Sequence, residues 1–212
     1  LLGDRMQFAD LGLVVVDEQH RFGVEQPAKL TDRASARPHV LVLTATPIPR
    51  SVAMTVFGDL EVSTLTELPG GRADVQTTVV DGLRHPAWVD RIWVRVREEV
   101  AQGRQVFVVS PRIESSDDKL VDGSFRHYVG VTELYERLRT EELAGLRLGL
   151  LHGQLPTDEK DAAMADLAAG RLDVLVATTV IEVGVDVPNA AMMVIWDADR
   201  FGISQLHQLR GR

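Results

Sequence analysis

The sequence contains no cysteine, which excludes disulfide bonds and thiolate metal sites. It contains no apolar run long enough to cross a membrane, so we expect no membrane partner. Residues 1–4 have neither a methionine nor the basic and apolar segments of a signal peptide, and we expect an internal cut there. These absences fit a reducing, cytoplasmic compartment.

Lysine is scarce, because only Lys29, Lys119 and Lys160 occur among the 23 basic residues. Phosphate or carboxylate partners would therefore meet mainly arginine, whose planar guanidinium binds two oxygens at once. None of the three lysines follows a glycine, and no Gly-x-x-x-x-Gly-Lys-Ser/Thr phosphate loop is present. The net charge of −8 argues against nucleic-acid binding by bulk electrostatics and leaves only local basic patches.

The most informative segment has four apolar residues, Leu13 to Val16, followed directly by Asp17 and Glu18. Such a run predicts a buried parallel strand, and ligands of open α/β sheets bind at the carboxyl ends of their strands. Asp17 is suited to hold Mg²⁺, mostly through water, while Glu18 orients a water molecule for nucleotide hydrolysis. The alternative is an acid that merely caps the next helix.

The 212 residues suffice for one large domain or two small ones. Pro69-Gly70-Gly71 breaks both periodicities, so we expect a first domain over 1–70, a linker over 71–74 and a second domain over 75–212. The polar residues 114–127 are expected to form a surface loop or an insertion. We expect strands over residues 12–17, 39–44, 62–65, 75–80, 105–110, 147–151, 173–178 and 191–196, and helices over 23–34, 49–57, 86–102, 130–143, 156–168 and 203–210.

Three further segments place hydroxyl, acidic or arginine side chains at predicted strand or helix ends. They are Thr44-Ala45-Thr46-Pro47, Ala177-Thr178-Thr179 with Gly184-Val185-Asp186, and Gln208-Leu209-Arg210-Gly211-Arg212. Together with the Asp17 segment they resemble motifs II, III, V and VI of superfamily-2 helicases, in the same order. The longer strings at residues 17–24, 44–50 and 199–202 look more specifically like the bacterial branched-DNA translocases of that superfamily.

The resemblance implies an α/β fold class with two RecA-like parallel-sheet domains, a P-loop NTPase helicase fold, both incomplete in this chain. It implies an ATP-dependent DNA helicase that remodels stalled forks and Holliday junctions in recombination and repair, with ATP and Mg²⁺ as cofactors. Branched double-stranded DNA is the expected partner, a single-stranded DNA-binding protein is a further candidate, and the expected location is the bacterial nucleoid. In this family the phosphate loop lies upstream of motif II, so we expect this chain alone to be inactive as an ATP hydrolase.

Besides Asp17 and Glu18, four residues are expected to contact the bound nucleotide. The resemblance implies that Gln208 and Arg212 act on the transferring γ-phosphate, where an added guanidinium contributes about 10³–10⁵ in rate. Gly184 would allow close approach of the backbone, and Asp186 would accept a hydrogen bond from a ribose hydroxyl or pair with an arginine. The alternative for the last two is a Val-Pro loop beside a core strand.

The remaining residues are expected either to couple the nucleotide site to DNA binding or to contact the DNA. The hydroxyls of Thr44 and Thr46 are expected near Gln19 and His20, and the resemblance implies that this contact couples nucleotide state to DNA grip. A threonine-rich turn closed by Pro47 is the alternative. Residues expected to contact the DNA backbone follow strands or begin a helix, and they are Arg50, Ser110, Arg112, His152, Thr178 and Thr179.

Two rival interpretations remain open. Transcription-repair coupling translocases resemble this chain through residues 44–50 and 199–202, whereas Gln19-His20 and Gly58-Asp59-Leu60 favour the branched-DNA translocases. A non-catalytic nucleic-acid-binding relative is the second rival. The intact Asp17, Glu18 and Arg212 count against it.

In the full-length protein, we predict that Glu18→Gln leaves ATP affinity nearly unchanged and lowers hydrolysis by about 10²-fold or more. Glutamine keeps the size and polarity of the side chain but cannot accept a proton from water. Steady-state ATPase with branched DNA, together with equilibrium nucleotide binding, measures both effects. Near-normal turnover would place the water-activating group elsewhere.

Overall fold

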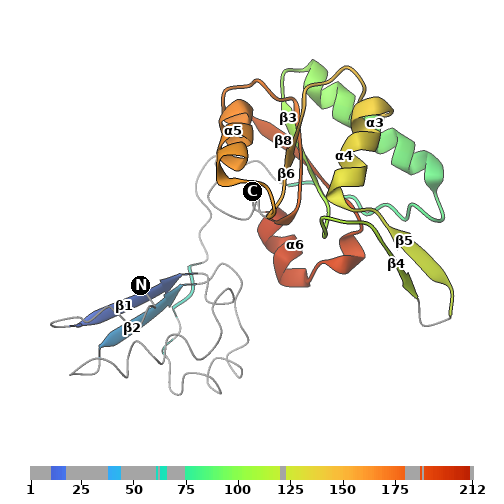
Figure 1. Cartoon of the computed structure of the whole chain (residues 1–212). Helices are drawn as coiled ribbons and strands as arrows, with labels where there is room; N and C mark the ends of the chain where they lie inside the picture. The colour runs from blue at the N-terminus through green and yellow to red at the C-terminus, as the bar shows by residue number, and fades with distance from the viewer. Residues whose placement is uncertain are drawn as a thin grey trace. The chain divides into compact units, whose positions relative to one another are not determined.

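The computed structural model describes residues 11–17, 38–43, 61, 63–65, 75–119, 123–179, 187 and 189–210. The chain divides into two compact units, Leu1–Ala73 and Asp74–Arg212, and each is described by itself (Figure 1).

In the first unit, strand β1 (Leu13–Asp17) pairs in parallel with β2 (His39–Leu43), from Leu13 opposite His39 to Asp17 opposite Leu43. Val14 and Val16 are buried, whereas Val15 is 53% exposed. The strands predicted at 12–17 and 39–44 are present as β1 and β2, and their parallel pairing is confirmed. The expected burial is not, because only alternate residues of β1 are buried and β2 is largely exposed, as at Leu41 (48%). The helices predicted over 23–34 and 49–57 lie outside the described residues.

The second unit is built on a four-stranded parallel sheet with the order β6-β7-β3-β8. Its strands are β3 (Gln105–Val109), β6 (Leu148–Leu151), β7 (Val174–Ala177) and β8 (Ala190–Ile195). Its helices are α3 (Pro86–Ala101), α4 (Val131–Thr140), α5 (Thr157–Ala168) and α6 (Ile203–Arg210), with a 3₁₀ turn η3 (Ala198–Arg200) before the last. An antiparallel hairpin of β4 (Ser116–Lys119) and β5 (Phe125–Tyr128) extends from this body (Figure 1).

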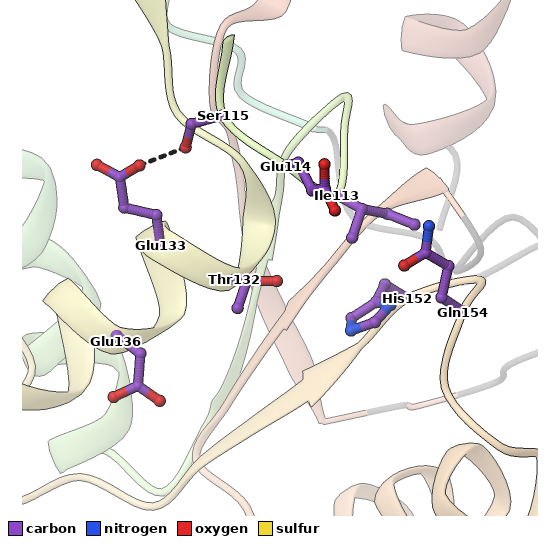
Figure 2. Close-up of a pocket in the computed structure, with 8 residues that line it drawn as sticks. All are labelled: Ile113, Glu114, Ser115, Thr132, Glu133, Glu136, His152 and Gln154. Carbon is purple, nitrogen blue, oxygen red and sulfur yellow. Dashed lines mark hydrogen bonds between the residues drawn. The ribbon is translucent and has the colours of Figure 1, made fainter.

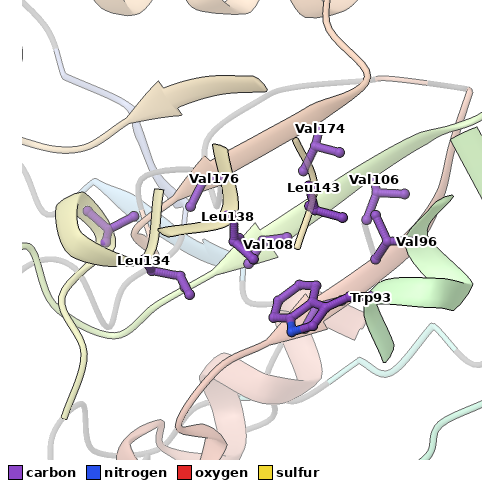
Figure 3. Packing of buried hydrophobic residues seen from close by; sticks show 11 residues of the cluster. Trp93, Val96, Val106, Val108, Leu134, Leu138, Leu143, Val174 and Val176 are labelled. Carbon is purple, nitrogen blue, oxygen red and sulfur yellow. The ribbon is translucent and has the colours of Figure 1, made fainter. Parts of the chain in front are cut away.

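Helices cover both faces of the sheet, which parallel sheets require because both faces are apolar. On one face Val106 and Val108 of β3 pack with Trp93 and Val96 of α3 and with Leu138 of α4 (Figure 3). On the other face Phe107 and Val109 pack with Leu167 of α5 and Leu209 of α6. Successive residues of one strand thus point to opposite layers, as strand geometry dictates.

Helix α3 follows from its sequence. Pro86 supplies the fixed φ of a first helical turn, and apolar residues recur on one stripe that includes the buried Trp93 and Val96. Gly103, with φ of 78°, adopts the left-handed conformation that ends the segment. The helix predicted over 86–102 is confirmed, as are those over 130–143, 156–168 and 203–210 within a few residues.

Three local predictions were wrong. Residues 75–80 and the described residues 63–65 form no strand, and side chains such as Val79 (87% exposed) bury too little apolar surface to hold one. Residues 114–127, expected to be a surface loop or an insertion, are not a simple loop, because they include β4 and most of β5 of an antiparallel hairpin. Within the described part of the chain, no helix is long and apolar enough to cross a membrane.

We predict that Leu138→Ala lowers the free energy of unfolding of the second unit by about 2–5 kcal/mol, because Leu138 is fully buried between α4 and the sheet. Leu83→Ala is the matched control, since Leu83 is 77% exposed and should cost little. Urea unfolding of residues 74–212 compares the two. Equal losses would contradict the packing described above.

Candidate functional site

Four polar segments follow the four parallel strands at one edge of the sheet. The Ser110 N–H donates to the Ala177 carbonyl (2.9 Å), the Thr178 N–H to the Leu151 carbonyl (3.1 Å) and the Trp196 N–H to the Val109 carbonyl (2.8 Å). These bonds extend the ladders just past the strand ends. The structure therefore brings Ser110, His152 and Thr178 to the same edge, where ligands of α/β sheets bind.

Ser110 supports this edge from inside. Its side chain is fully buried, and its hydroxyl donates to the Val129 carbonyl over 3.1 Å. In this structure the hydroxyl has a structural role and is not presented to a phosphate, and the DNA contact of Ser110 stays a prediction. Thr178 is 6% exposed, whereas Thr179 is half-buried and presents more surface.

A pocket of about 420 Å³ lies beside this edge, between the segment after β3, the start of α4 and the segment after β6. Its lining includes His152, Gln154 and three glutamates, Glu114, Glu133 and Glu136 (Figure 2). His152 is 9% exposed, and its Nδ1 has no hydrogen-bond partner within the described part of the chain. The carboxylates make this pocket a poor place for an anion and a better one for a hydrogen-bond donor.

Arg112 turns toward the hairpin. Its guanidinium lies 3.6 Å from the Asp118 carboxylate and 5.5 Å from the centre of the Tyr128 ring, and it donates to the Ser116 hydroxyl. Asp118 also accepts from Ser116, which with the neighbouring arginines holds the pKa of Asp118 below its usual range. In this structure Arg112 is engaged by carboxylate and aromatic groups, so a phosphate would have to displace them.

Tyr128 is the centre of a cluster that the sequence did not indicate. The ring is 3% exposed, and the guanidinium groups of Arg126 and Arg200 lie 4.7 Å and 3.8 Å from its centre. Its hydroxyl donates to Asp199 over 3.3 Å. In the sequence, Asp199-Arg200-Phe201-Gly202 contributed to the family resemblance, but it indicated no role for Asp199 or Arg200.

Helix α6 carries Gln208, which is half-buried. Just before the helix, the Gly202 N–H donates to the Gln205 side chain over 3.1 Å. Phe201 and Leu209 anchor the segment in the core against Phe107 and Val109. Arg212, at the end of the same motif, lies outside the described residues.

In the first unit, Asp17 closes β1 opposite Leu43 of β2, at the carboxyl end of both parallel strands. One carboxylate at such an end suits Mg²⁺, which is usually held by one or two carboxylates together with water and phosphate oxygens. No cluster of three potential ligands that could hold a metal occurs among the residues described. The other predicted residues outside the described part are Glu18, Gln19, His20, Thr44, Thr46, Arg50, Gly184 and Asp186.

Comparison with known proteins defines the class. Residues 87–212 match the family model of the helicase conserved C-terminal domain. The chain therefore belongs to this helicase family.

The particular likeness is to RecG. The chain is 61% identical over its whole length to the ATP-dependent DNA helicase RecG of Mycobacterium tuberculosis H37Rv and 47% identical to that of Bacillus subtilis 168. A structure of RecG bound to a three-way DNA junction is 44% identical, with a TM-score of 0.63 over 98% of this chain and 25% of that one. The chain spans 29% of the length of both curated relatives.

These comparisons confirm the resemblance drawn from the motifs at residues 17–24, 44–50 and 199–202. They also confirm the α/β class with a RecA-like parallel sheet. The roles of individual residues stay predictions.

His127 on the hairpin yields a pH prediction. Its Nδ1 lies 2.8 Å from an Asp117 oxygen and its Nε2 3.7 Å from a Glu133 oxygen, and the hydrogen bond to Asp117 raises the pKa of His127. A raised folded pKa stabilises the protein fully below about pH 6.5, and this contribution is lost as the pH rises through the folded value. The ion pairs that join the hairpin to α4 through His127 therefore weaken as the pH rises through this raised pKa.

An NMR titration of the histidine rings checks this prediction, and we expect His127 to titrate above about 6.5. Asp117→Asn should return its pKa toward the ordinary value. A His127 pKa at or below the ordinary value in the unaltered protein would rule out the two ion pairs.

Proposed function

We propose that this chain is the motor segment of an ATP-dependent DNA helicase that acts on branched DNA. The observation that carries the proposal is the 61% identity to a RecG helicase across the whole chain. The parallel sheet of the second unit, with polar segments after every strand, suits such a motor because ligands bind at that edge. Stalled forks and Holliday junctions are the proposed substrates, in recombination and repair in the bacterial nucleoid, and a single-stranded DNA-binding protein is a proposed partner.

ATP with Mg²⁺ is the proposed cofactor pair. When bound, Mg²⁺ would neutralise charge on the phosphates, and Asp17 would hold it mostly through water. Glu18 would orient the attacking water and accept its proton. Gly184 and Asp186 would contact the nucleotide, the first through its backbone and the second through its carboxylate.

Gln208 and Arg212 are proposed to act as charge develops on the γ-phosphate. Both belong to the segment that begins with α6, and the anchored Phe201 and Leu209 limit the freedom of that helix. A donor held in place before reaction stabilises a transition state without a cost of reorganisation. The position of α6 therefore bears directly on turnover in this proposal.

DNA contact is proposed at the edge of the second sheet and at Arg50. Thr179 is the best-placed group there, since Ser110 is buried, Arg112 is paired with Asp118 and His152 lies in the pocket lined by glutamates. Contact by Ser110, Arg112, His152 and Thr178 stays part of the proposal. Sequence-independent contact of this kind uses hydroxyl and backbone N–H groups on phosphate oxygens. We further propose that four residues of the first unit couple the state of the bound nucleotide to the strength of DNA binding: Gln19, His20, Thr44 and Thr46.

The test measures ATPase of the full-length protein with a three-way junction and with a linear duplex of the same base composition. We expect ATP hydrolysis that depends on DNA and is stimulated more strongly by the junction. Equal stimulation by linear duplex would favour a translocase without branch preference, as in the transcription-repair coupling rival. No DNA-dependent hydrolysis would overturn the proposal.

We predict that Arg212→Ala lowers kcat by about 10³-fold while changing ATP affinity little, because its charge acts mainly in the transition state. Arg210→Ala is the matched control, since Arg210 is an exposed arginine at the end of α6 and only two positions away in the sequence. Steady-state kinetics and nucleotide binding separate the two effects. Comparable losses of affinity and turnover would make Arg212 a ground-state binding residue.

A further inference from the structure

We propose that the β4–β5 hairpin is a brace that sets the position of α6, with Arg126, Tyr128 and Arg200 as positioning residues for ATP turnover. The expected effect on ATP turnover rests on the proposed function, whereas the positioning of α6 by the hairpin does not. The proposal stands on contacts between the hairpin and the turn that leads from β8 into α6.

Arg126 of β5 makes the main connection. One of its guanidinium nitrogens lies 3.2 Å from an Asp199 oxygen and another lies 3.3 Å from an Asp197 oxygen. A single guanidinium thus holds two carboxylates of the turn, which the planar fork of arginine permits. From the other side, Arg200 of the turn pairs with Asp118 of β4.

Tyr128 contacts the arginines of both bridges. Arg200 and Arg126 both lie over its ring, and its hydroxyl donates to Asp199. Partly desolvated cation–π contacts are stronger than exposed ones, and the ring is only 3% exposed. A ring buried in this way is closed to base stacking, so the cluster is suited to internal support rather than to direct contact with nucleic acid.

The turn depends on these contacts because of Asp197. This residue has φ of 48°, the left-handed region that side chains other than glycine rarely adopt. Its side chain is 10% exposed, and burial raises the pKa of its carboxyl group. Removal of Arg126 would leave a buried carboxylate without its ion-pair partner in a strained backbone, which favours rearrangement of the turn.

The turn passes its position to α6 over a very short distance along the chain. The Arg200 N–H donates to the Asp197 carbonyl over 2.9 Å, and the Phe201 N–H donates to the Ala198 carbonyl over 3.2 Å. Phe201 is buried in the core, and only Gly202 separates it from the helix. A shift of the turn therefore displaces the first turn of α6.

The test compares variants of the full-length protein by hydrogen exchange of residues 203–210 and by DNA-stimulated ATPase. Arg126→Met keeps the apolar stem and removes the charge, while Tyr128→Phe keeps the ring and removes only the hydroxyl bond. Arg126→Lys keeps a positive charge and serves as the conservative rescue. Arg139→Met is the matched control, because Arg139 is an exposed arginine on α4 that pairs with Glu136 at 2.8 Å.

For Arg126→Met we expect exchange in 203–210 to rise about fivefold and kcat to fall about tenfold, with the KM for ATP within about twofold of normal. Tyr128→Phe should shift both in the same direction by less, and Arg126→Lys should recover most of the loss. The Arg139→Met control should change neither.

Unchanged exchange in 203–210 with Arg126→Met would overturn the brace. Faster exchange with normal kcat would overturn its part in turnover. If the unaltered protein lacks DNA-stimulated ATPase, the proposed function fails, and the exchange experiment still decides whether the hairpin holds α6.

Discussion

The second unit depends on the parallel backbone pairing of β3 with both β7 and β8. A strand paired on both sides in a parallel sheet exposes two apolar faces, and neither can be left to solvent. Val106 and Val108 therefore need α3 and α4, while Phe107 needs α5 and α6. The same parallel direction brings the segments after all four strands to one edge, so packing and site follow from one constraint.

Carboxylates limit how strongly the carboxyl-end edge of this sheet can attract a phosphate, although arginine is abundant in the sequence. The chain is rich in arginine among its basic residues, yet many arginines in the second unit are engaged by carboxylates, as Arg112 is by Asp118. The nearby pocket is lined by glutamates. Phosphate contact there would fall to hydroxyl and backbone N–H groups, which bind a DNA backbone without reading its sequence.

The hairpin shows how polar segments gain order from distant partners. Asp117, Asp118 and Lys119 bury little apolar surface, so nothing local favours a strand. Order comes from the pairing of β4 with β5 and from ion pairs to the Asp197–Arg200 turn, some seventy to eighty residues away in sequence. The helix that carries Gln208 begins directly after that turn, which links this surface feature to the proposed chemistry.

The sequence by itself determined the helicase family, the apolar strands such as Val106–Val109 and the amphipathic helix at Pro86–Ala101, because periodicity and family motifs are local properties. It also placed Ser110 and His152 at one edge, since parallel strands end together. Only the tertiary structure decided that the Ser110 hydroxyl faces inward and that residues 75–80 lack a strand. The cluster around Tyr128 was equally invisible, because its partners meet only after β5 and the turn beyond β8 come together in the fold.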